Sequence, residues 1–491
     1  MATDSSMKKV LLSASLFLLS LCMACGGNSS NNGPTPQGNF SNASLSGQYA
    51  YHLAGTDLST GGVFREGGVF TADGKGNITS GNDDFSEGTG GVSTNSSSGN
   101  YSIANDGTGT VVLNLAGGSI TLGVTLISTS RLQMIEGDGF ANASGGAALQ
   151  TASAFAAPPS GTFAFRLHTV STAQGSTGRV GVMTVSGGVV TGGFEDENAA
   201  GVLSAPVLTA GLFNPPDGTG RGTGSFTDNS NTTTDFIYYV IDGNNFRILT
   251  SDPGILGMGR AQLQTGSFSD ASLNGSYAFG STGDTNASLG GSRTAGRLTA
   301  DGAGNISAGA FDSVQDGVQT LNGTFSTGTF SAVDATGRTV LTLNASSGTI
   351  TEIFQMVDSS HGFFLVDDAN KVEDGSFDKQ TTSSFSNSTM NGQFAFVMDG
   401  FDPNGLLDRV GTLQWDGNGN LALDELVNRE GSVTTSGVLP GTYSVSSNGR
   451  TTGSVSNLSG NLIFYLISAN DAYIVQADSS TEVDGSMSLQ Q

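Results

Sequence analysis

The stretch that decides the fold is Gly47-Gln-Tyr49-Ala-Tyr51, because close copies of it recur along the chain. The copies are Gly161-Thr-Phe163-Ala-Phe165, Gly275-Ser-Tyr277-Ala-Phe279 and Gly392-Gln-Phe394-Ala-Phe396. Their glycines follow one another at intervals of 114, 114 and 117 residues. Alternate side chains of a β-strand point to the same face, so we expect Tyr49 and Tyr51 to lie together in a core. The sequence therefore predicts four copies of one β unit.

Further landmarks keep the same phase within the units. Three units carry Asp-Gly-x-Gly-Asn, at Asp73–Asn77, Asp301–Asn305 and Asp416–Asn420, whereas the second has only Ser186-Gly-Gly. Asp, Gly and Asn suit tight hairpins that need positive φ angles. Calcium binding is the alternative, although the spaced carboxylates and bidentate Glu of an EF-hand loop are missing. Each unit closes on a glutamine, namely Gln150, Gln264, Gln380 and Gln490.

Composition and periodicity favour strands over helices. Glycine contributes 74 of the 491 residues, and charged residues only 12%. In the first unit Ile120, Leu122, Val124 and Leu126 alternate with small or polar residues, as in a strand with one buried face. Turn residues divide each unit into about eight such segments, a spacing typical of a sandwich or barrel. We place the repeats at 41–155, 156–268, 269–382 and 383–491.

These features predict an all-β chain of tandem antiparallel barrels, each with about eight strands. The unit resembles the calycin class, the lipocalins and avidins, whose first strand begins Gly-x-Trp. This chain has Tyr or Phe there, and its single tryptophan, Trp415, lies elsewhere. The whole unit is also similar to an uncharacterised repeat of bacterial surface lipoproteins. Immunoglobulin-like sandwiches are the alternative fold.

Two strands are apolar on both faces and need cover on their outward side. They are Phe236-Ile-Tyr-Tyr-Val-Ile241 in the second unit and Leu462-Ile-Phe-Tyr-Leu-Ile467 in the fourth. We expect them to pack against neighbouring units, joining the first unit to the second and the third to the fourth. A thicker barrel core is the alternative.

The N-terminus predicts export and lipid anchoring. Lys8 and Lys9 precede an apolar run of signal-peptide length. The stretch Leu21-Cys22-Met23-Ala24-Cys25 then resembles a bacterial lipobox, which implies cleavage after residue 24 and lipid attachment at Cys25. It departs from the usual pattern in having Cys22 three positions before the lipidated residue. An ordinary cleaved signal peptide is the alternative.

The mature chain would begin with a polar tether over residues 25–40. Similarity to other lipoproteins implies the outer membrane, because Gly26 rather than Asp follows Cys25. Both cysteines fall within the first 25 residues, which leaves no thiol for a disulfide or thiolate metal site in the repeats.

Charge and motif content argue against several classes of function. The formal net charge of −24 would repel a phosphate backbone, so nucleic acid is excluded as a partner. The three histidines, His52, His168 and His361, occupy unrelated positions in their units, and we expect them at surface or strand-edge positions. No Gly-x-Ser-x-Gly elbow or Walker-type phosphate loop occurs. We expect no cofactor, no metal and no enzymatic activity.

Adjacent carboxylates are the remaining candidates for chemistry. They are Asp83 with Asp84, Glu195 with Asp196 and Glu197, and Asp367 with Asp368. Sequence neighbours on a strand point to opposite faces, so we interpret them as solvated loop charges rather than as a glycosidase pair.

The sequence thus predicts a cell-envelope protein anchored to the membrane by lipid, whose repeats are non-enzymatic binding or spacer modules. An envelope glycan or another protein is the expected partner. The calycin resemblance implies an alternative, the carriage of a small apolar ligand inside the barrels. An envelope hydrolase is a further alternative.

Overall fold

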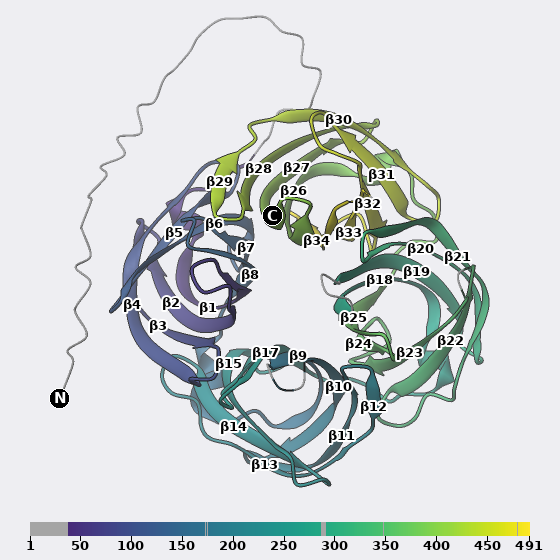
Figure 1. The fold of residues 1–491 in the computed structure, drawn as a ribbon, viewed down its shortest axis with the longest axis horizontal. Coiled ribbons are helices and arrows are strands. Elements are labelled where there is room, and N and C mark those ends of the chain that lie inside the picture. Colours follow the sequence, from purple (N-terminus) through teal and green to yellow (C-terminus); the bar gives the residue numbers. More distant parts are fainter. Residues whose placement is uncertain (1–37, 172, 174, 286–290, 347, 479) are drawn as a thin grey trace, which may run out of the picture. The chain divides into compact units, whose positions relative to one another are not determined.

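The chain is all-β, with four closed eight-stranded antiparallel barrels in tandem (Figure 1). The computed structural model describes residues 38–171, 173, 175–285, 291–346, 348–478 and 480–491. The predicted signal peptide, Cys25 and the tether up to residue 37 lie outside the described residues. Because each sheet closes on itself, the immunoglobulin-like alternative is wrong.

Barrel 1 is an up-and-down meander in which the first strand pairs with both the second and the eighth. A short 3-10 helix, η1 (Asn42–Ser44), precedes it. Its strands are β1 (Ser46–Asp57), β2 (Val63–Asp73), β3 (Asn77–Glu87), β4 (Val92–Ile103), β5 (Thr108–Leu115), β6 (Gly118–Ser128), β7 (Arg131–Glu136) and β8 (Ala141–Leu149).

Barrel 2 follows the 3-10 helix η2 (Ala152–Ala156). Its fourth strand is interrupted at Pro206, which has no N–H to donate to the sheet. The strands are β9 (Gly161–Ser171), β10 (Gly175–Ser186), β11 (Val189–Ala199), β12 (Val202–Ser204), β13 (Val207–Phe213), β14 (Arg221–Asp228), β15 (Thr233–Asp242), β16 (Asn245–Thr250) and β17 (Ile255–Leu263).

Barrel 3 repeats the uninterrupted meander of barrel 1. It begins with the 3-10 helix η3 (Asp270–Ser272). Its strands are β18 (Asn274–Thr285), β19 (Gly291–Asp301), β20 (Asn305–Gln315), β21 (Val318–Phe330), β22 (Arg338–Ala345), β23 (Gly348–Met356), β24 (His361–Val366) and β25 (Lys371–Lys379).

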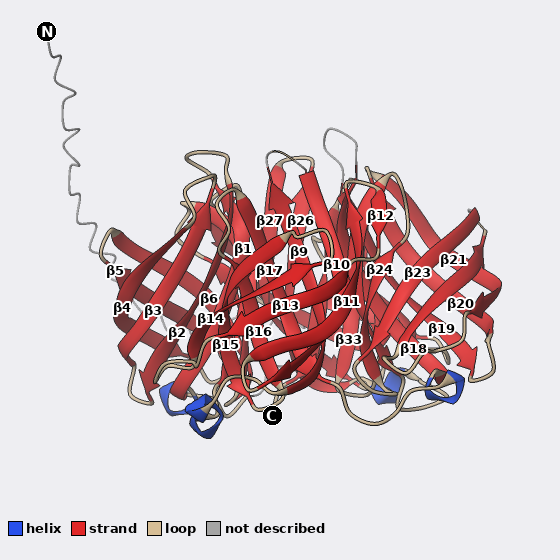
Figure 2. Cartoon of the chain, turned by 90° about the horizontal axis from the view of Figure 1, so that it is seen from below, coloured by secondary structure: helices blue, strands red, loops and turns tan. Residues whose placement is uncertain are grey.

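Barrel 4 resembles barrel 2 in having a divided fourth strand. The 3-10 helix η4 (Asn387–Thr389) precedes it, and Figure 2 shows the short helices of the chain at one end of the barrels. Its strands are β26 (Asn391–Asp402), β27 (Gly405–Asp416), β28 (Asn420–Arg429), β29 (Ser432–Thr435), β30 (Leu439–Val445), β31 (Arg450–Val455), β32 (Asn461–Leu466), β33 (Asp471–Ala477) and β34 (Glu482–Leu489).

Each barrel has its own core of inward-facing aromatic and aliphatic side chains. Tyr49 and Tyr51 are fully buried in the core of barrel 1, as predicted. Phe40, assigned to the polar tether, packs against this core and donates its backbone N–H to the Asn105 carbonyl at 3.0 Å. The last residues of the predicted tether therefore belong to barrel 1.

The Asp-Gly-x-Gly-Asn segments form hairpin turns between the second and third strands. In the first, Asp73 Oδ1 accepts the N–H groups of Lys75 and Asn77 at 2.7 and 3.0 Å. Gly74 and Gly76 have φ angles of 73° and 104°, which glycine adopts without strain. Equivalent bonds form in the hairpins of barrels 3 and 4. The prediction of turn chemistry is confirmed.

The four barrels contact one another in sequence, and the fourth contacts the first, so that residues 38–491 form a ring (Figure 1). The closing glutamine of each barrel makes the same contact at every joint. Its side-chain amide donates to a backbone carbonyl of the next barrel, at 2.6 to 2.7 Å, in the pairs Gln150–Val240, Gln264–Met356, Gln380–Leu466 and Gln490–Leu126. The residue after each glutamine adds a backbone hydrogen bond across the same joint.

Apolar side chains fill the joints that the sequence predicted. Ile237 and Tyr239 of β15 face out of barrel 2 and pack against Ala50 and Val69 of barrel 1. Ile463 and Tyr465 of β32 pack in the same way against barrel 3. The predicted packing of these two strands against their neighbours is confirmed. It does not produce isolated pairs, because Val180 of barrel 2 also packs against Phe363 and Leu365 of barrel 3.

Three joints also hold a bidentate ion pair between an arginine of one barrel and an aspartate of the preceding barrel. The nitrogen–oxygen distances are 2.7 to 2.8 Å in Arg221–Asp84, Arg338–Asp196 and Arg450–Asp312. Such paired hydrogen bonds fix orientation as well as adding energy.

The joint between barrels 4 and 1 lacks this ion pair. By strand register, Thr108 of β5 stands where the other barrels have the arginine, and Leu426 of β28 stands where they have the aspartate. Leu426 lies over Gly123, where an added methyl group would come within 2.1 Å of the leucine Cδ2. The joint that closes the ring therefore replaces a salt bridge by an apolar contact.

Candidate functional site

The inner side of the ring carries an unusual row of three arginines. Arg247 on β16 is directly opposite Arg260 on β17, which is directly opposite Arg166 on β9. Figure 1 shows β9 and β17 on the side of barrel 2 that faces the other barrels. Adjacent strands lie about 4.8 Å apart, and like charges directly opposite each other destabilise a sheet. We call Arg166, Arg260 and Arg247 the arginine row.

The arginine row is only partly compensated by carboxylates. Arg166 Nε lies 3.0 Å from Asp374 Oδ1 of barrel 3. Arg260 donates to Ser376 Oγ at 2.5 Å and stacks over the Phe363 ring, 4.8 Å from its centroid. No described residue makes a hydrogen bond or ion pair with the Arg247 side chain. One end of the row therefore holds an uncompensated positive charge.

Burial and mutual repulsion lower the pKa values of two of these guanidinium groups. The pKa of Arg247 falls to about 9, first because of burial and then because Arg260, Arg131 and Arg166 are close. Burial followed by repulsion from Arg166 lowers the pKa of Arg260 to about 10. Both groups remain cationic at neutral pH, in a protein whose net charge is −24.

The arginine row also acts on His52, which lies on β1 of barrel 1. Burial, and then the charges of Arg247 and Arg260, hold its pKa well below the usual range of histidine. Its Nδ1 and the Nε of Arg260 are buried atoms with no hydrogen-bond partner among the described residues. A buried polar atom without a partner calls for an explanation, and a bound group that satisfies it is one.

A row of three aspartates, of the opposite charge, lies on barrel 4. In the strand register Asp399 is directly opposite both Asp484 and Asp408. Asp484 and Asp408 have partners on other barrels. Asp484 lies 2.9 Å from Arg293 Nε, and Asp408 accepts a hydrogen bond from Asn142 of barrel 1 at 2.9 Å. Burial and the nearby Asp399 hold the pKa of Asp408 well above its usual range. This row serves the contacts between barrels.

The prediction of surface or strand-edge histidines is wrong for His168, which lies within β9, whereas His361 is the first residue of β24. His168 Nδ1 lies 2.6 Å from Asp374 Oδ2 of barrel 3. Burial opposes the charged form of His168, but Asp374 and then Asp284 raise its pKa to about 9. His361 lies 2.7 Å from Asp378 and 2.7 Å from Gln262 of barrel 2. Both histidines join barrels 2 and 3.

The interpretation of the adjacent carboxylates as loop charges is wrong for two of the three groups. Asp83 and Asp84 are buried on β3, and Glu195 and Asp196 are buried on β11. They do point to opposite faces, as the alternation predicts, since Asp84 joins barrel 2 while Asp83 faces inward. Asp367 and Asp368 lie in the loop between β24 and β25, as predicted.

The interior of barrel 1 holds a buried carboxyl cluster. The Tyr51 hydroxyl is 2.9 Å from Asp83 Oδ1 and 3.1 Å from Glu66 Oε1. Burial and the nearby Asp83 raise the pKa of Glu66 well above its usual range. At the corresponding strand positions barrel 4 has an ion pair, with Arg409 Nη2 2.8 Å from Glu425 Oε1. We interpret these groups as polar contents of filled barrels.

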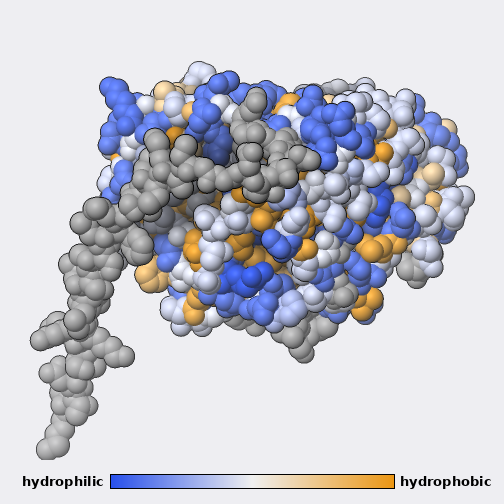
Figure 3. All heavy atoms as spheres, turned by 90° about the horizontal axis from the view of Figure 1, so that it is seen from above, coloured by the Kyte–Doolittle hydropathy of each residue, from blue (hydrophilic) through white to orange (hydrophobic). Residues whose placement is uncertain are grey.

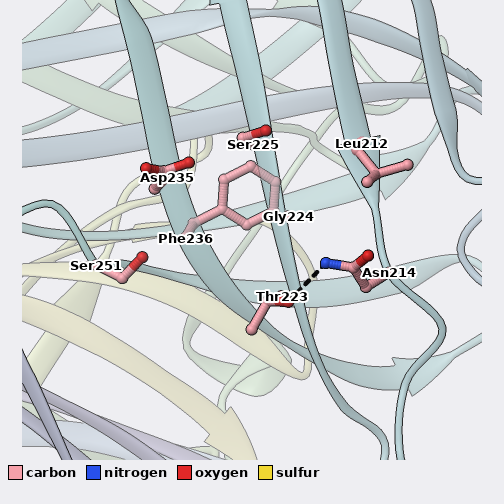
Figure 4. Close-up of a pocket in the computed structure, with 8 residues that line it drawn as sticks. All are labelled: Leu212, Asn214, Thr223, Gly224, Ser225, Asp235, Phe236 and Ser251. Carbon is pink, nitrogen blue, oxygen red and sulfur yellow. Dashed lines mark hydrogen bonds between the residues drawn. The ribbon is translucent and has the colours of Figure 1, made fainter.

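A hollow of about 260 Å³ lies on barrel 2 between β13, β14 and β15 (Figure 4). Its floor is the edge of Phe236, which is directly opposite Gly224 in the sheet. Asn214 donates to Thr223 Oγ1 at its rim, 2.9 Å away. The lining contains one carboxylate, Asp235, and no histidine or cysteine, so it has no pair of groups for nucleophilic or acid–base chemistry.

Comparison with protein-family models and with curated proteins gives no match for this chain. Among the described residues, no His, Cys, Asp or Glu side chains converge in threes as metal ligands, and none of the described helices has the length and apolarity to cross a membrane. On the face shown in Figure 3, apolar side chains are interspersed with polar ones. The inner side of the ring is therefore the candidate binding surface.

Proposed function

We propose that the protein is a lipid-anchored component of the cell envelope, held at the outer membrane, whose four barrels act as one rigid, non-enzymatic binding module. The lipobox-like stretch ending at Cys25 supports the anchor. The observation that carries the binding module is the set of four equivalent glutamine bonds, which fix every barrel against its neighbours. Binding groups on different barrels are then held at constant spacing, so little entropy is lost when a ligand binds.

The packed interiors favour binding on the ring surface over carriage of an apolar ligand inside the barrels. Each barrel core is occupied by its own large side chains, including Tyr49 and Phe70 in barrel 1 and Trp415 and Phe464 in barrel 4. An eight-stranded barrel is just wide enough for its own side chains to fill it. An envelope glycan or protein is the class of partner that this proposal favours.

The anchor is tested by expressing the full chain and its Cys25→Ser variant in a bacterium and separating membrane from soluble fractions. We expect incorporation of a labelled fatty acid into the wild type only, with release of the variant from the membrane. Labelling of both proteins, or of neither, would contradict lipid attachment at Cys25.

The binding function is tested on residues 26–491 by native mass spectrometry of protein recovered from an envelope extract, followed by pull-down with envelope glycan and envelope protein. Our proposal predicts no bound apolar molecule and retention of one of these two partners. A bound apolar molecule released on denaturation would support the carrier function instead.

A further inference from the structure

We infer that the arginine row forms a binding site for a small ligand with two or more oxyanion groups, phosphate or carboxylate. The inference rests on the proposed binding function and adds a small anionic ligand to the glycan or protein partner. It starts from the register of β16, β17 and β9, which places three guanidinium groups side by side across neighbouring strands.

The row is costly for the free protein. Directly opposed like charges destabilise a sheet, and burial raises this cost because repulsion grows as water is excluded. Sites that break a local rule of stability are where functional groups are expected.

Nearby carboxylates do not remove the excess positive charge. Asp374 is shared between Arg166 and His168. Asp378 is engaged by His361 and by the Tyr473 hydroxyl, which donates to it at 2.5 Å. Arg247 is left with Arg260 directly opposite it, and the charge of Arg131 also acts on it.

The donors that remain suit an oxyanion. Arg247 offers a whole guanidinium group, and Arg260 offers its buried Nε. Guanidinium forks match carboxylate and phosphate oxygens in paired hydrogen bonds. Arg166 is accessible from solvent, with 34% of its side chain exposed, so an anion can reach the row.

The length of the row selects a ligand with more than one anionic group. Three adjacent strands span about 10 Å from the first guanidinium to the third, which exceeds the width of one phosphate. The other barrels do not repeat the site. By strand register, the residues in place of Arg247, Arg260 and Arg166 are Phe363, Ser376 and Gly280 in barrel 3. The ring therefore offers one such site on its inner side.

The test is isothermal titration of residues 26–491 with tripolyphosphate, citrate and inorganic phosphate, at an ionic strength kept constant with sodium chloride. The variant is Arg247→Gln with Arg260→Gln. The matched control is Lys75→Gln with Lys379→Gln, which removes the same charge from sites outside the row. Titrations with tripolyphosphate and with citrate distinguish phosphate from carboxylate ligands.

We expect saturable binding of one polyanion to the wild type and the control, and about tenfold or greater weakening in the arginine variant. Inorganic phosphate should bind more weakly than the polyanion. Thermal unfolding without ligand establishes that the variant is folded, and Arg247→Lys with Arg260→Lys gives a second variant that keeps the charge but loses the fork.

Equal weakening of polyanion binding by Arg247→Gln with Arg260→Gln and by Lys75→Gln with Lys379→Gln would overturn the site, because general electrostatics would then explain the binding. Absence of saturable binding to the wild type would also overturn it. Neither outcome affects the retention of an envelope glycan or protein in the pull-down, so failure of this site is distinguishable from failure of the binding function.

Discussion

The side-chain amide of Gln490 donates a hydrogen bond to the backbone carbonyl of Leu126, 2.7 Å away, although the two residues lie 364 positions apart in the sequence. The same amide lies 2.9 Å from the Asp106 carbonyl. This contact repeats at the chain's end what Gln150, Gln264 and Gln380 do within it. Barrel 4 therefore contacts barrel 1 in the same way as each other barrel contacts the next one, and this contact closes the ring.

Replacing Gln490 by alanine should loosen the closing joint. A buried carbonyl that loses its partner costs about 1–3 kcal/mol. We expect the variant to be destabilised by this amount, with faster hydrogen exchange in β6 and β7 than in β15 and β16. Hydrogen exchange with mass spectrometry measures both regions in one experiment.

Gln491→Ala is the control, because Gln491 crosses the joint through its backbone N–H, which donates to the Ile127 carbonyl at 2.9 Å. This variant should exchange like the wild type. Equal protection of β6 and β7 in the two variants would show that the side chain of Gln490 does not hold the ring closed.

The Arg–Asp ion pair of the other three joints should also form at the joint between barrels 4 and 1 when its two residues are introduced there. Leu426→Asp alone places a carboxylate over Gly123 with no cation to meet it, and an unpaired buried charge costs about 3–5 kcal/mol. Adding Thr108→Arg should recover much of this loss, since the other joints pair these two positions. Urea unfolding of the two single variants and the double variant gives the coupling energy.

Additive effects in that cycle would contradict the assigned equivalence of Thr108 with Arg221, and of Leu426 with Asp84. Arg221→Thr with Asp84→Leu is the reciprocal control at the first joint. This double variant should lose the ion pair without leaving a buried charge. Its destabilisation should therefore be smaller than that of Asp84→Leu alone, which leaves Arg221 without its carboxylate partner.

The barrel itself was predictable because its signals are local. Alternation placed Tyr49 and Tyr51 in one core, and the Asp73–Asn77 spacing gave the hairpin. The double apolar face of Phe236–Ile241 predicted a joint, because its outer face required cover. In each case the sequence pattern that carries the prediction lies on one strand or one turn.

The ring and the arginine row were not predictable in this way. Gln490 bonds to a backbone carbonyl, which any residue type provides, so its partner leaves no mark in the sequence. Arg166 and Arg260 become neighbours only because β9 pairs with β17, two strands from opposite ends of one repeat. Aligning the repeats strand by strand would have shown one available signal, the change of Arg to Thr108 and of Asp to Leu426 in the two end repeats.

The charge on His168 should stabilise the joint between barrels 2 and 3 at neutral pH. Its pKa is raised to about 9 in the folded protein, above the unfolded value of about 6.5. The stabilisation is therefore complete below about pH 6.5 and is lost as the pH rises through the folded pKa. We expect His168→Gln to lower the free energy of unfolding by up to about 3 kcal/mol at pH 6, and less above pH 9.

His52→Gln is the matched control, because burial lowers the pKa of His52. A lowered histidine pKa gives stability that is lost as the pH falls, so this variant should show the opposite pH dependence. Urea unfolding from pH 5 to 10 measures both. A pH-independent effect of His168→Gln would mean that its imidazole acts without charge.

Arg247→Gln should raise the stability of the free protein, which is the reverse of the usual effect of losing a half-buried side chain. The variant removes repulsion from Arg260, and a directly opposed pair is worth about 0.2–1 kcal/mol. Thermal unfolding in low salt and in high salt measures the gain. It should shrink with salt, because ions screen the repulsion in the wild type.

Arg221→Gln provides the contrast, because Arg221 makes a bidentate pair with buried Asp84 and its loss leaves that carboxylate without its cation. This variant should be less stable than the wild type.

A polyanion that occupies the arginine row should stabilise the wild type more than Arg247→Gln, since binding adds stability only to a protein that retains the site. If Arg247→Gln were less stable than the wild type in the absence of anions, the Arg247 guanidinium would be a structural group. The arginine row would then not destabilise the free protein, which would contradict the oxyanion site.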